Sequence, residues 1–347
     1  MTMIEGRLIR GLGQAADFTR IEWVRRQFID LAGIDPHPGT VNLALGDPAN
    51  RARWARWRDA PGHSMAPADA AFCSARCYPV RIEGRLPAAV VLPEIADYPE
   101  DKVELVAALP VRLHLSLDEG ARVRVELCRP LVAQAVLFDL DGTLIDSVGA
   151  YLEVARLAAR AHGLEVTEAQ VRFALATGSN FWKGVVPADR RDGESVIKDM
   201  SAHAGREWPH VLREHGKVFA GVAQTLDALK RMGIRLGIVS GARPEVLELL
   251  RQDGVLDRFD SVVLGADVST RKPDPEGILK CLRNLGVAPE AAVYVGDTPV
   301  DIQASRAAGA RAVGVLTGAG DSAMLSVQGP DRLIGSHARL AEIMVPA

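Results

Sequence analysis

Short apolar runs alternate with helical patterns over the last two thirds of the chain. Runs this short and continuously apolar are typical of strands that are covered on both faces. The runs lie at 133–138, 235–239, 261–264, 292–295 and 312–316. Helical patterns lie between them at 225–232, 244–253, 276–285 and 301–308. This alternation predicts an α/β fold with a Rossmann-like, mainly parallel sheet.

The stretch from residue 147 to about 217 interrupts that alternation with helical patterns alone. They cover 151–162, 168–176 and 194–203. The insertion comes directly after the first predicted strand. We therefore expect a helical cap over the strand ends, where it would exclude water and select substrates.

The first 130 residues show short alternating or apolar runs bounded by Gly and Pro. We expect strands at 5–10, 76–83, 88–92, 103–115 and 121–127. Apolar positions at helical spacing predict one helix, at 20–31. Short strands with one helix favour a small β-barrel. We therefore expect two domains, 1–130 and 131–347.

The composition is that of a globular protein with nearly balanced charge. Of the 347 residues, 48% are hydrophobic and 24% are charged, and the net charge is −3. This balance argues against nucleic-acid binding through bulk charge. We see no signal peptide and no apolar run long enough to span a bilayer. We therefore expect a cytoplasmic protein without membrane association, with its four cysteines reduced.

Two aspartates, Asp139 and Asp141, follow the first strand of the second domain. Strand residues two apart face the same side, so these carboxylates repel each other unless a cation or a proton lies between them. Ser240 and Asp297 follow two other predicted strands. Ligands of such sheets bind at the carboxyl ends of the strands. We therefore expect these side chains to form one site.

Phosphoryl transfer accounts for this set of residues. Asp139 can attack phosphorus and form an aspartyl-phosphate, while Asp141 can protonate the leaving oxygen and later activate water. Carboxylate oxygens are suitable Mg²⁺ ligands. The predicted Mg²⁺ ligands are Asp139, Asp141, Asp297 and Asp301.

Three further residues complete the predicted site. Ser240 and the N–H group of Gly241 can hold phosphate oxygens, and Lys272 can neutralise charge on Asp139 and the phosphate. Alone, Ser240 or Lys272 would be read as a helix cap or a solvated charge. Only their combination with the aspartates gives them a functional role.

These motifs, in this order, resemble the haloacid dehalogenase superfamily from Leu131 to about Thr317. They are Asp139-Leu140-Asp141-Gly142-Thr143, Ser240, Lys272-Pro273 and Gly296-Asp297-Thr298-Pro299-Val300-Asp301. Dehalogenases lack a general acid at the position of Asp141, because a halide leaves unaided. The resemblance therefore implies a phosphatase, most similar to the phosphoglycolate-phosphatase-like group with a helical cap. A β-phosphomutase shares both aspartates and the cap, and stays open as an alternative.

Two pieces of the first domain are candidate ligand sites. Gly11-Leu12-Gly13 allows backbone N–H groups to approach a phosphate closely, although a plain turn has the same pattern. Thr40 and Asn42 can present oxygens to Mg²⁺ together with nucleotide phosphates, or can cap a turn.

The segment from Ile4 to Leu127 resembles the archaeal-type CTP-dependent riboflavin kinase family, a small β-barrel that transfers phosphate from CTP to riboflavin. The shared pieces are Gly11-Leu12-Gly13, Arg26-Gln27-Phe28, the Pro-Gly-Thr-x-Asn-Leu stretch, Tyr98-Pro99 and Val103-Glu104-Leu105-Val106. The resemblance implies that the Gly11 loop and the stretch ending at Arg112 hold the nucleotide. It also implies that Thr40 and Asn42 hold Mg²⁺ and that Glu104 contacts the flavin. Ala96 stands where the family has a threonine that contacts the flavin.

Three functional hypotheses stay open. The first is an Mg²⁺-dependent phosphatase acting on a small phosphorylated metabolite. The second is a bifunctional enzyme with a CTP-dependent kinase in front, for which riboflavin, FMN and CTP are the ligands. In the third, the first domain binds a flavin-like ligand or a nucleotide without chemistry. The fusion suggests that both halves meet related compounds, such as FMN or a phosphorylated ribityl precursor.

Overall fold

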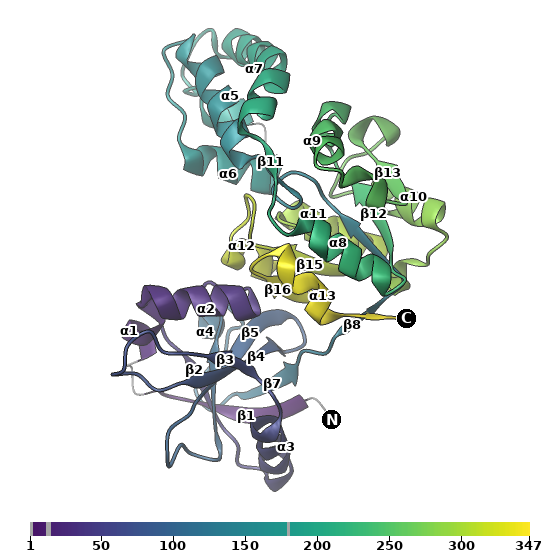
Figure 1. The fold of residues 1–347 in the computed structure, drawn as a ribbon. Helices are drawn as coiled ribbons and strands as arrows, with labels where there is room; N and C mark the ends of the chain where they lie inside the picture. Colours follow the sequence, from purple (N-terminus) through teal and green to yellow (C-terminus); the bar gives the residue numbers. More distant parts are fainter. Residues whose placement is uncertain (1–2, 12–14, 179–180) are drawn as a thin grey trace. The chain divides into compact units, whose positions relative to one another are not determined.

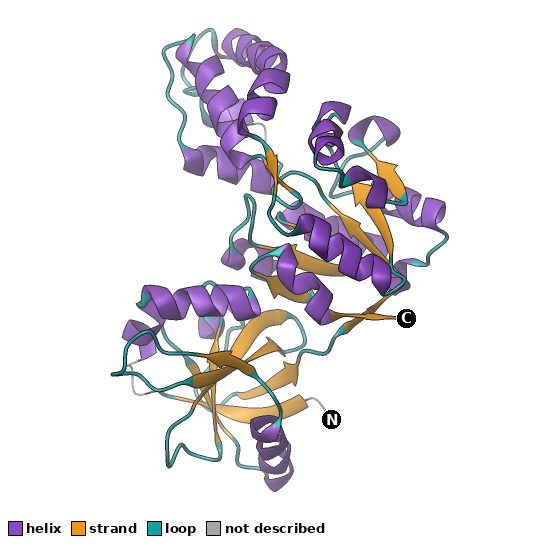
Figure 2. Cartoon of the chain, viewed as in Figure 1, coloured by secondary structure: helices purple, strands orange, loops and turns teal. Residues whose placement is uncertain are grey.

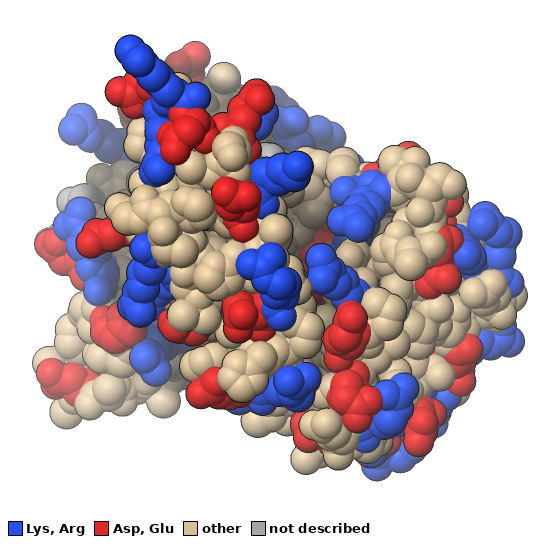
Figure 3. All heavy atoms as spheres, turned by 90° about the horizontal axis from the view of Figure 1, so that it is seen from above, with Lys and Arg blue, Asp and Glu red and all other residues tan. Residues whose placement is uncertain are grey.

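The chain divides into two compact units in the computed structural model, which describes residues 3–11, 15–178 and 181–347 (Figure 1). One unit comprises Met1–Pro130 and Asp321–Ser336, and the other comprises Leu131–Gly320 and His337–Ala347. None of the described helices combines the length and the apolarity needed to cross a membrane. Basic and acidic side chains are interspersed on the face drawn in Figure 3, as the near balance of charges in the sequence leads one to expect.

The first unit is built on a closed antiparallel barrel, which confirms the predicted small β-barrel. The strand order is β4-β5-β6-β2-β1-β7, and a pairing of β4 with β7 closes the six-stranded ring. A short seventh strand, β3 (His63–Met65), adds to β4. The six barrel strands are β1 (Met3–Ile9), β2 (Val41–Ala44), β4 (Ala75–Ile82), β5 (Leu86–Pro93), β6 (Lys102–Val106) and β7 (Arg122–Leu127).

Alternate positions of the barrel strands fill its interior. Ile4 and Leu8 of β1 are fully buried, as are Val123 and Val125 of β7. This period of two follows from the pleat, which turns successive side chains to opposite faces. The core of the first unit is therefore the inside of the barrel.

Our expectation of one helix in this unit is wrong. The structure has α1 (Ala15–Arg20), α2 (Glu22–Ala32), α3 (Pro48–Asp59), α4 (Val111–His114) and α12 (Ser322–Val327). Helix α3 begins at a proline after an Asp47 N-cap, whose side chain accepts from the N–H of Asn50. It has little amphipathic pattern because arginines surround its buried Trp54 and Trp57.

The strand expected at 103–115 is also too long. Strand β6 ends at Val106, and Pro110 is the N-cap of α4. Proline has no N–H for a sheet ladder and a fixed φ that suits a helix start. The apolar residues after Val106 therefore pack against the barrel core from a turn and a short helix.

A late segment of the sequence packs with the first unit, although we expected residues 131–347 to form one domain. Helix α12 and strand β16 (Arg332–Ile334) lie in the segment 321–336. The hydroxyl of Ser322 donates to the carbonyl oxygen of Gly33 at 3.0 Å. Gly33 has φ of 66°, and a Cβ there would lie 2.4 Å from the backbone of Leu333. The spacing of apolar residues along the chain does not reveal such close packing between backbones. The domain boundaries stay a prediction.

The second unit is a Rossmann-like α/β domain, as predicted. Its parallel strands follow the order β13-β12-β9-β14-β15, with β9 in the centre. Helices lie on both sides of this sheet (Figure 2). The strands are β9 (Ala135–Phe138), β12 (Arg235–Val239), β13 (Ser261–Val263), β14 (Ala292–Gly296) and β15 (Arg311–Val315). The helices are α8 (Val222–Arg231), α9 (Leu247–Gln252), α10 (Glu276–Leu285), α11 (Pro299–Ala308) and α13 (Leu340–Ile343). Outside this sheet, strand β8 (Leu131–Ala133) pairs with β17 (Met344–Pro346).

A cap of three helices is inserted between β9 and α8. Two short strands, β10 (Ile145–Asp146) and β11 (Lys217–Val218), pair antiparallel and form its stem. The helices are α5 (Val148–Arg160), α6 (Glu168–Thr177) and α7 (Gly193–His215). They enclose a core of their own that includes Ala158, Val196 and Met200.

Helix α7 extends well beyond the predicted 194–203. It continues through Pro209, because Trp208 before that proline and Val211 and Leu212 after it are buried. Tertiary burial thus outweighs the local cost of a proline inside the helix.

Candidate active site

Asp139, Ser240 and Asp297 lie together at the carboxyl edge of the parallel sheet. They directly follow β9, β12 and β14, which are neighbours in the sheet. The N–H of Asp139 donates to the carbonyl oxygen of Val295 at 2.9 Å, so the chain after β9 stays beside β14. The parallel register therefore brings together residues that are far apart in sequence.

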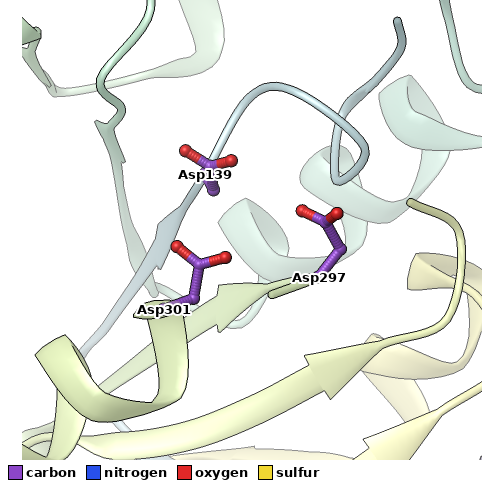
Figure 4. Close-up of side chains that lie close together, drawn as sticks. All are labelled: Asp139, Asp297 and Asp301. Carbon is purple, nitrogen blue, oxygen red and sulfur yellow. The ribbon is translucent and has the colours of Figure 1, made fainter. Parts of the chain in front are cut away.

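Three carboxylates form a compact buried group at this edge. Asp139, Asp297 and Asp301 each offer an oxygen, and these oxygens lie within 4.8 Å of one another (Figure 4). Asp301 comes from the first turn of α11. Asp139 is 6% exposed and the other two are 1% exposed, so water cannot screen their mutual repulsion well.

Lys272 connects two members of this group. Its ammonium donates to Asp139 Oδ1 at 2.8 Å, to Asp301 Oδ1 at 2.5 Å and to the hydroxyl of Tyr294 at 2.9 Å. Although burial lowers the pKa of Lys272, Asp139 and Asp301 raise it well above its usual value, so the amine is charged. One positive charge thus faces three carboxylates.

The electrostatics of the group fit a divalent cation. Burial, opposed by Lys272 and reinforced by Asp301 and Asp141, raises the pKa of Asp139 to about 6. Burial and the neighbouring aspartates likewise raise the pKa of Asp297 well above its usual range. A buried excess of negative charge with hard oxygen donors is the environment in which Mg²⁺ binds. Asp139 and Asp297 therefore have the chemistry to hold it.

Asp297 is held in one orientation by close neighbours. Its Oδ1 accepts from the Thr143 hydroxyl at 3.0 Å, and its Oδ2 accepts from the Ala319 N–H at 2.8 Å. A Cβ placed on Gly142 or Gly318 would lie 2.4 or 2.0 Å from Asp297 Oδ2. Glycine is therefore required at both positions so that two backbones can approach this carboxylate.

Asp141 is not a member of the three-carboxylate group, although we predicted its side chain as an Mg²⁺ ligand. Its Oδ2 accepts from the hydroxyl of Tyr151 on the cap at 3.3 Å. Its Oδ1 is buried and has no hydrogen-bond partner among the described residues. Burial raises the pKa of Asp141, which suits a group that must give up a proton.

Ser240, Gly241 and Lys272 line a small cavity at the same edge. The Ser240 hydroxyl accepts from the Ala242 N–H at 3.3 Å. A Cβ on Gly241 would meet nothing within 4 Å, so its backbone faces open space. These positions are compatible with the predicted role in holding phosphate oxygens, which stays a prediction.

A second cavity, of about 420 Å³, lies between the cap helices and the loop after β12. Four aromatic residues line it, namely Tyr151, Phe181, Trp182 and Trp208. No pattern in the sequence singled out Tyr151 or Trp208 as candidate site residues. The aromatic spacing in α5 and α7 looks like ordinary core packing, so no sequence signal separates these residues from the cap core.

The barrel unit has its own cavity, of about 600 Å³. It brings together the predicted ligand-binding residues Gly11, Thr40, Asn42, Glu104 and Arg112. Gly13 lies outside the described residues.

Two contacts shape this cavity. A Cβ on Gly11 would lie 2.4 Å from Asn42 Nδ2, so the backbone passes close to that amide. Lys102 forms an ion pair with Glu104 and lies over the Tyr98 ring, 5.8 Å from its centroid. Glu104, which the family resemblance assigns to the flavin, is thus paired with Lys102, a residue outside the predicted site.

The second unit is defined by aspartates on neighbouring strand ends, a lysine that bridges two of them and an inserted cap. This arrangement belongs to phosphohydrolases with a Rossmann-like sheet. Residues 136–315 match the family model of the haloacid dehalogenase-like hydrolases, and the chain belongs to this family. Residues 8–127 match the family model of the CTP-dependent riboflavin kinases, described as a domain of unknown function, DUF120. Both resemblances seen in the sequence are thereby confirmed.

Curated relatives cover the second unit. The phosphoglycolate phosphatase of Aquifex aeolicus is 33% identical over 223 residues, which span 61% of this chain and 96% of that protein. The phosphoglycolate phosphatase of Salmonella typhimurium is 31% identical over 224 residues, which span 58% and 89%. This chain is therefore a phosphatase similar to the phosphoglycolate phosphatases, joined to a riboflavin kinase-like domain.

Solved structures show the same fold. A haloacid dehalogenase-like family hydrolase from Streptococcus pneumoniae has a TM-score of 0.52 at 19% identity and covers 60% of this chain and 97% of its own. A hydrolase from Pseudomonas syringae has a TM-score of 0.51 at 22% identity and covers 61% and 99%.

Proposed function

We propose that the second unit hydrolyses a small phosphomonoester through an aspartyl-phosphate on Asp139, in an Mg²⁺-dependent reaction. The observation that carries this proposal is the position of Lys272, whose ammonium contacts Asp139 and Asp301 beside Asp297. A lysine so placed lowers the repulsion between a nucleophilic carboxylate and an anionic phosphate.

The reaction has two steps. Asp139 attacks phosphorus while Asp141 gives its proton to the leaving oxygen, and the alcohol departs. Asp141, now a carboxylate, takes a proton from water, which attacks the phosphorus of the aspartyl-phosphate and releases inorganic phosphate. Ser240 and the Gly241 N–H hold phosphate oxygens during both steps. Asp139, Asp297 and Asp301 would hold Mg²⁺, which when bound would neutralise charge on the phosphate.

The substitution Asp139→Asn tests this mechanism. It removes the nucleophile with little change in volume, so release of inorganic phosphate should fall by at least about a thousand-fold. Asp199→Asn, at an exposed position on α7, is the matched control and should keep the parental rate. Hydrolysis by Asp139→Asn at the parental rate would show that the mechanism is wrong. Product analysis separates a phosphatase, which releases inorganic phosphate, from a phosphomutase, which returns an isomeric sugar phosphate.

Two substrates have a specific reason to be assayed. The relatives are phosphoglycolate phosphatases by name, which makes phosphoglycolate a candidate. The riboflavin kinase-like unit makes FMN, or a phosphorylated ribityl precursor, the other candidate.

CTP-dependent riboflavin phosphorylation in the barrel unit is the second candidate function. One cavity is lined by residues that the family resemblance assigns to CTP, Mg²⁺ and flavin, namely Gly11, Thr40, Asn42, Glu104 and Arg112. The test is incubation with CTP, Mg²⁺ and riboflavin in the Asp139→Asn background, where FMN cannot be hydrolysed again. Formation of FMN supports a bifunctional enzyme. Heat of riboflavin binding without FMN formation indicates a binding module, in keeping with Ala96 in place of a threonine.

A further inference from the structure

We propose that the phosphomonoester cleaved at Asp139 carries a flat aromatic ring on its leaving alcohol, and that the aromatic cavity under the cap receives this ring. This inference rests on the proposed function, because it names the substrate class of the same site.

The cavity has the lining of an aromatic binding site. Its aromatic residues form two pairs on the cap. The rings of Tyr151 and Trp208 lie 4.3 Å apart at 34°, and those of Phe181 and Trp182 lie 4.7 Å apart at 63°. Most of the remaining cap residues around the cavity are aliphatic. Offset and edge-on contacts with such rings favour another flat π system over an alkyl chain.

One wall residue of the cavity contacts the group that we assign to the leaving oxygen. Tyr151 lines the cavity and donates from its hydroxyl to Asp141 Oδ2 at 3.3 Å. Asp141 is the proposed proton donor to the leaving oxygen, so the departing alcohol lies beside Tyr151. On the sheet side the same cavity is lined by Gly241, whose N–H we assign to the phosphate, and by Ala242. The cavity therefore lies on the path that leads from the phosphate to the leaving group.

The size of the cavity excludes a very small leaving group as a good fit. A cavity of about 420 Å³ lies in the range that holds drug-sized ligands. A two-carbon alcohol would leave most of it filled with water against apolar walls. Water in such a place makes few hydrogen bonds, and an apolar ring that displaces it gains affinity.

Two arginines mark the end at which the anion enters. Arg243 and Arg271 line the cavity from the sheet side, and both are exposed. A Cβ on Gly205 of α7 would lie 3.7 Å from Arg243 Nη2, so this guanidinium extends toward the cap. The cavity thus has guanidinium groups from its sheet side and aromatic rings on its cap side. This polarity matches an anionic ester with an aromatic body.

A panel of primary-alcohol phosphates tests the inference, because their leaving groups have similar reactivity. The ring-bearing members are benzyl phosphate, naphthylethyl phosphate and FMN, and the others are glycerol phosphate and phosphoglycolate. With the full-length protein and Mg²⁺, we expect kcat/KM to be at least about ten-fold higher for the ring-bearing esters. Equal or higher kcat/KM for glycerol phosphate and phosphoglycolate would overturn the inference.

Two cavity variants and one control test whether the cavity causes a preference for ring-bearing esters. Trp208→Leu keeps an apolar side chain but removes the ring, and should lower the ratio of ring-bearing to ring-free kcat/KM by about five-fold. Because Trp208 is buried, Ser201→Phe provides a second variant at an exposed position on the cavity wall, and it should lower the same ratio by obstruction. Phe173→Leu, on α6 at a side chain 61% exposed outside the cavity, should leave the ratio unchanged. A ratio unchanged in both cavity variants would contradict the inference.

Measuring how the esters bind to the Asp139→Asn variant tests this inference separately from the proposed function. Calorimetry with naphthylethyl phosphate and glycerol phosphate measures the preference without turnover. If the parent hydrolyses none of the esters but Asp139→Asn binds the ring-bearing ester at least about ten-fold more tightly, the proposed function fails and the cavity assignment stands. If the parent hydrolyses both and the variant binds them equally, the proposed function stands and the cavity assignment fails.

Discussion

The ammonium of Lys272 lies 2.8 Å from Asp139 Oδ1, although the two residues are 133 positions apart in the chain. The same ammonium contacts Asp301, so one cation is shared by two buried carboxylates. This sharing makes the charge of Lys272 important for activity and for stability.

Lys272→Met should therefore remove most of the phosphatase activity. Loss of one preorganised donor typically lowers kcat by about a hundred- to a thousand-fold. Unfolding in urea without Mg²⁺ should show a loss of about 3 kcal/mol, because buried carboxylates lose their partner. Lys198→Met, at an exposed position on α7, is the control and should match the parent in both measurements. Parental activity in Lys272→Met would refute the role of the lysine.

Gly318→Ala should weaken Mg²⁺ binding without unfolding the protein. Its Cβ would lie 2.0 Å from Asp297 Oδ2, so the carboxylate must move away from its Thr143 and Ala319 partners. We expect the Mg²⁺ concentration for half-maximal activity to rise by at least about ten-fold. Gly149→Ala, in helix α5 where a Cβ meets nothing within 4 Å, should keep the parental value. An unchanged Mg²⁺ requirement in Gly318→Ala would argue against Asp297 as a ligand.

Gly11→Ala should impair ligand binding by the barrel unit. The new Cβ would lie 2.4 Å from Asn42 Nδ2 and would displace a side chain that lines the 600 Å³ cavity. Calorimetry with riboflavin and with CTP should show at least about a ten-fold loss of affinity for one of them. Gly46→Ala meets nothing within 4 Å and serves as the control. If both variants bind alike, the Gly11 loop has no part in recognition.

His337 should contribute to the loss of stability at acidic pH. Burial lowers its pKa below the usual 6.5, and its ring Nε2 lies 3.2 Å from the carbonyl oxygen of Ala220. The unfolded chain therefore binds a proton near pH 6.5 that the folded chain does not yet bind. The free energy of unfolding falls as the pH drops from 6.5 toward the lowered pKa, by at most about 1.4 kcal/mol per pH unit. Below the lowered pKa this contribution levels off.

Urea unfolding of His337→Gln between pH 7.5 and 5 measures this contribution, at about half-unit intervals. The parent's free energy of unfolding should approach that of the variant as the pH falls, because the variant has no imidazole to protonate. His114→Gln, at an exposed position on α4, is the control, and its free energy of unfolding should follow the same pH dependence as that of the parent. A His337→Gln curve parallel to the parent across the whole range would contradict this assignment.

The order of apolar and polar residues along the chain was enough to predict the class of each half and the candidate site of the phosphatase. Continuous apolar runs define strands such as β9 and β14, and polar residues directly after such runs must lie at one edge of a parallel sheet. Asp139, Ser240 and Asp297 could therefore be assigned to one site from order alone. The barrel class was equally predictable, because the period of two along β1 and β7 is a local property.

Which side chains contact one another depends on the three-dimensional packing of the chain. The separation of Asp141 from the three-carboxylate group depends on the turn after β9, and the Tyr151–Asp141 hydrogen bond depends on how the cap lies over that turn. Helix α3 and the packing of Ser322 against Gly33 also depend on burial by distant residues. The spacing of apolar residues shows which face of a helix or strand is apolar. What that face packs against depends on residues far away in the sequence. For this reason the candidate catalytic residues could be predicted from the sequence, while the aromatic cavity that we assign to the leaving group could not.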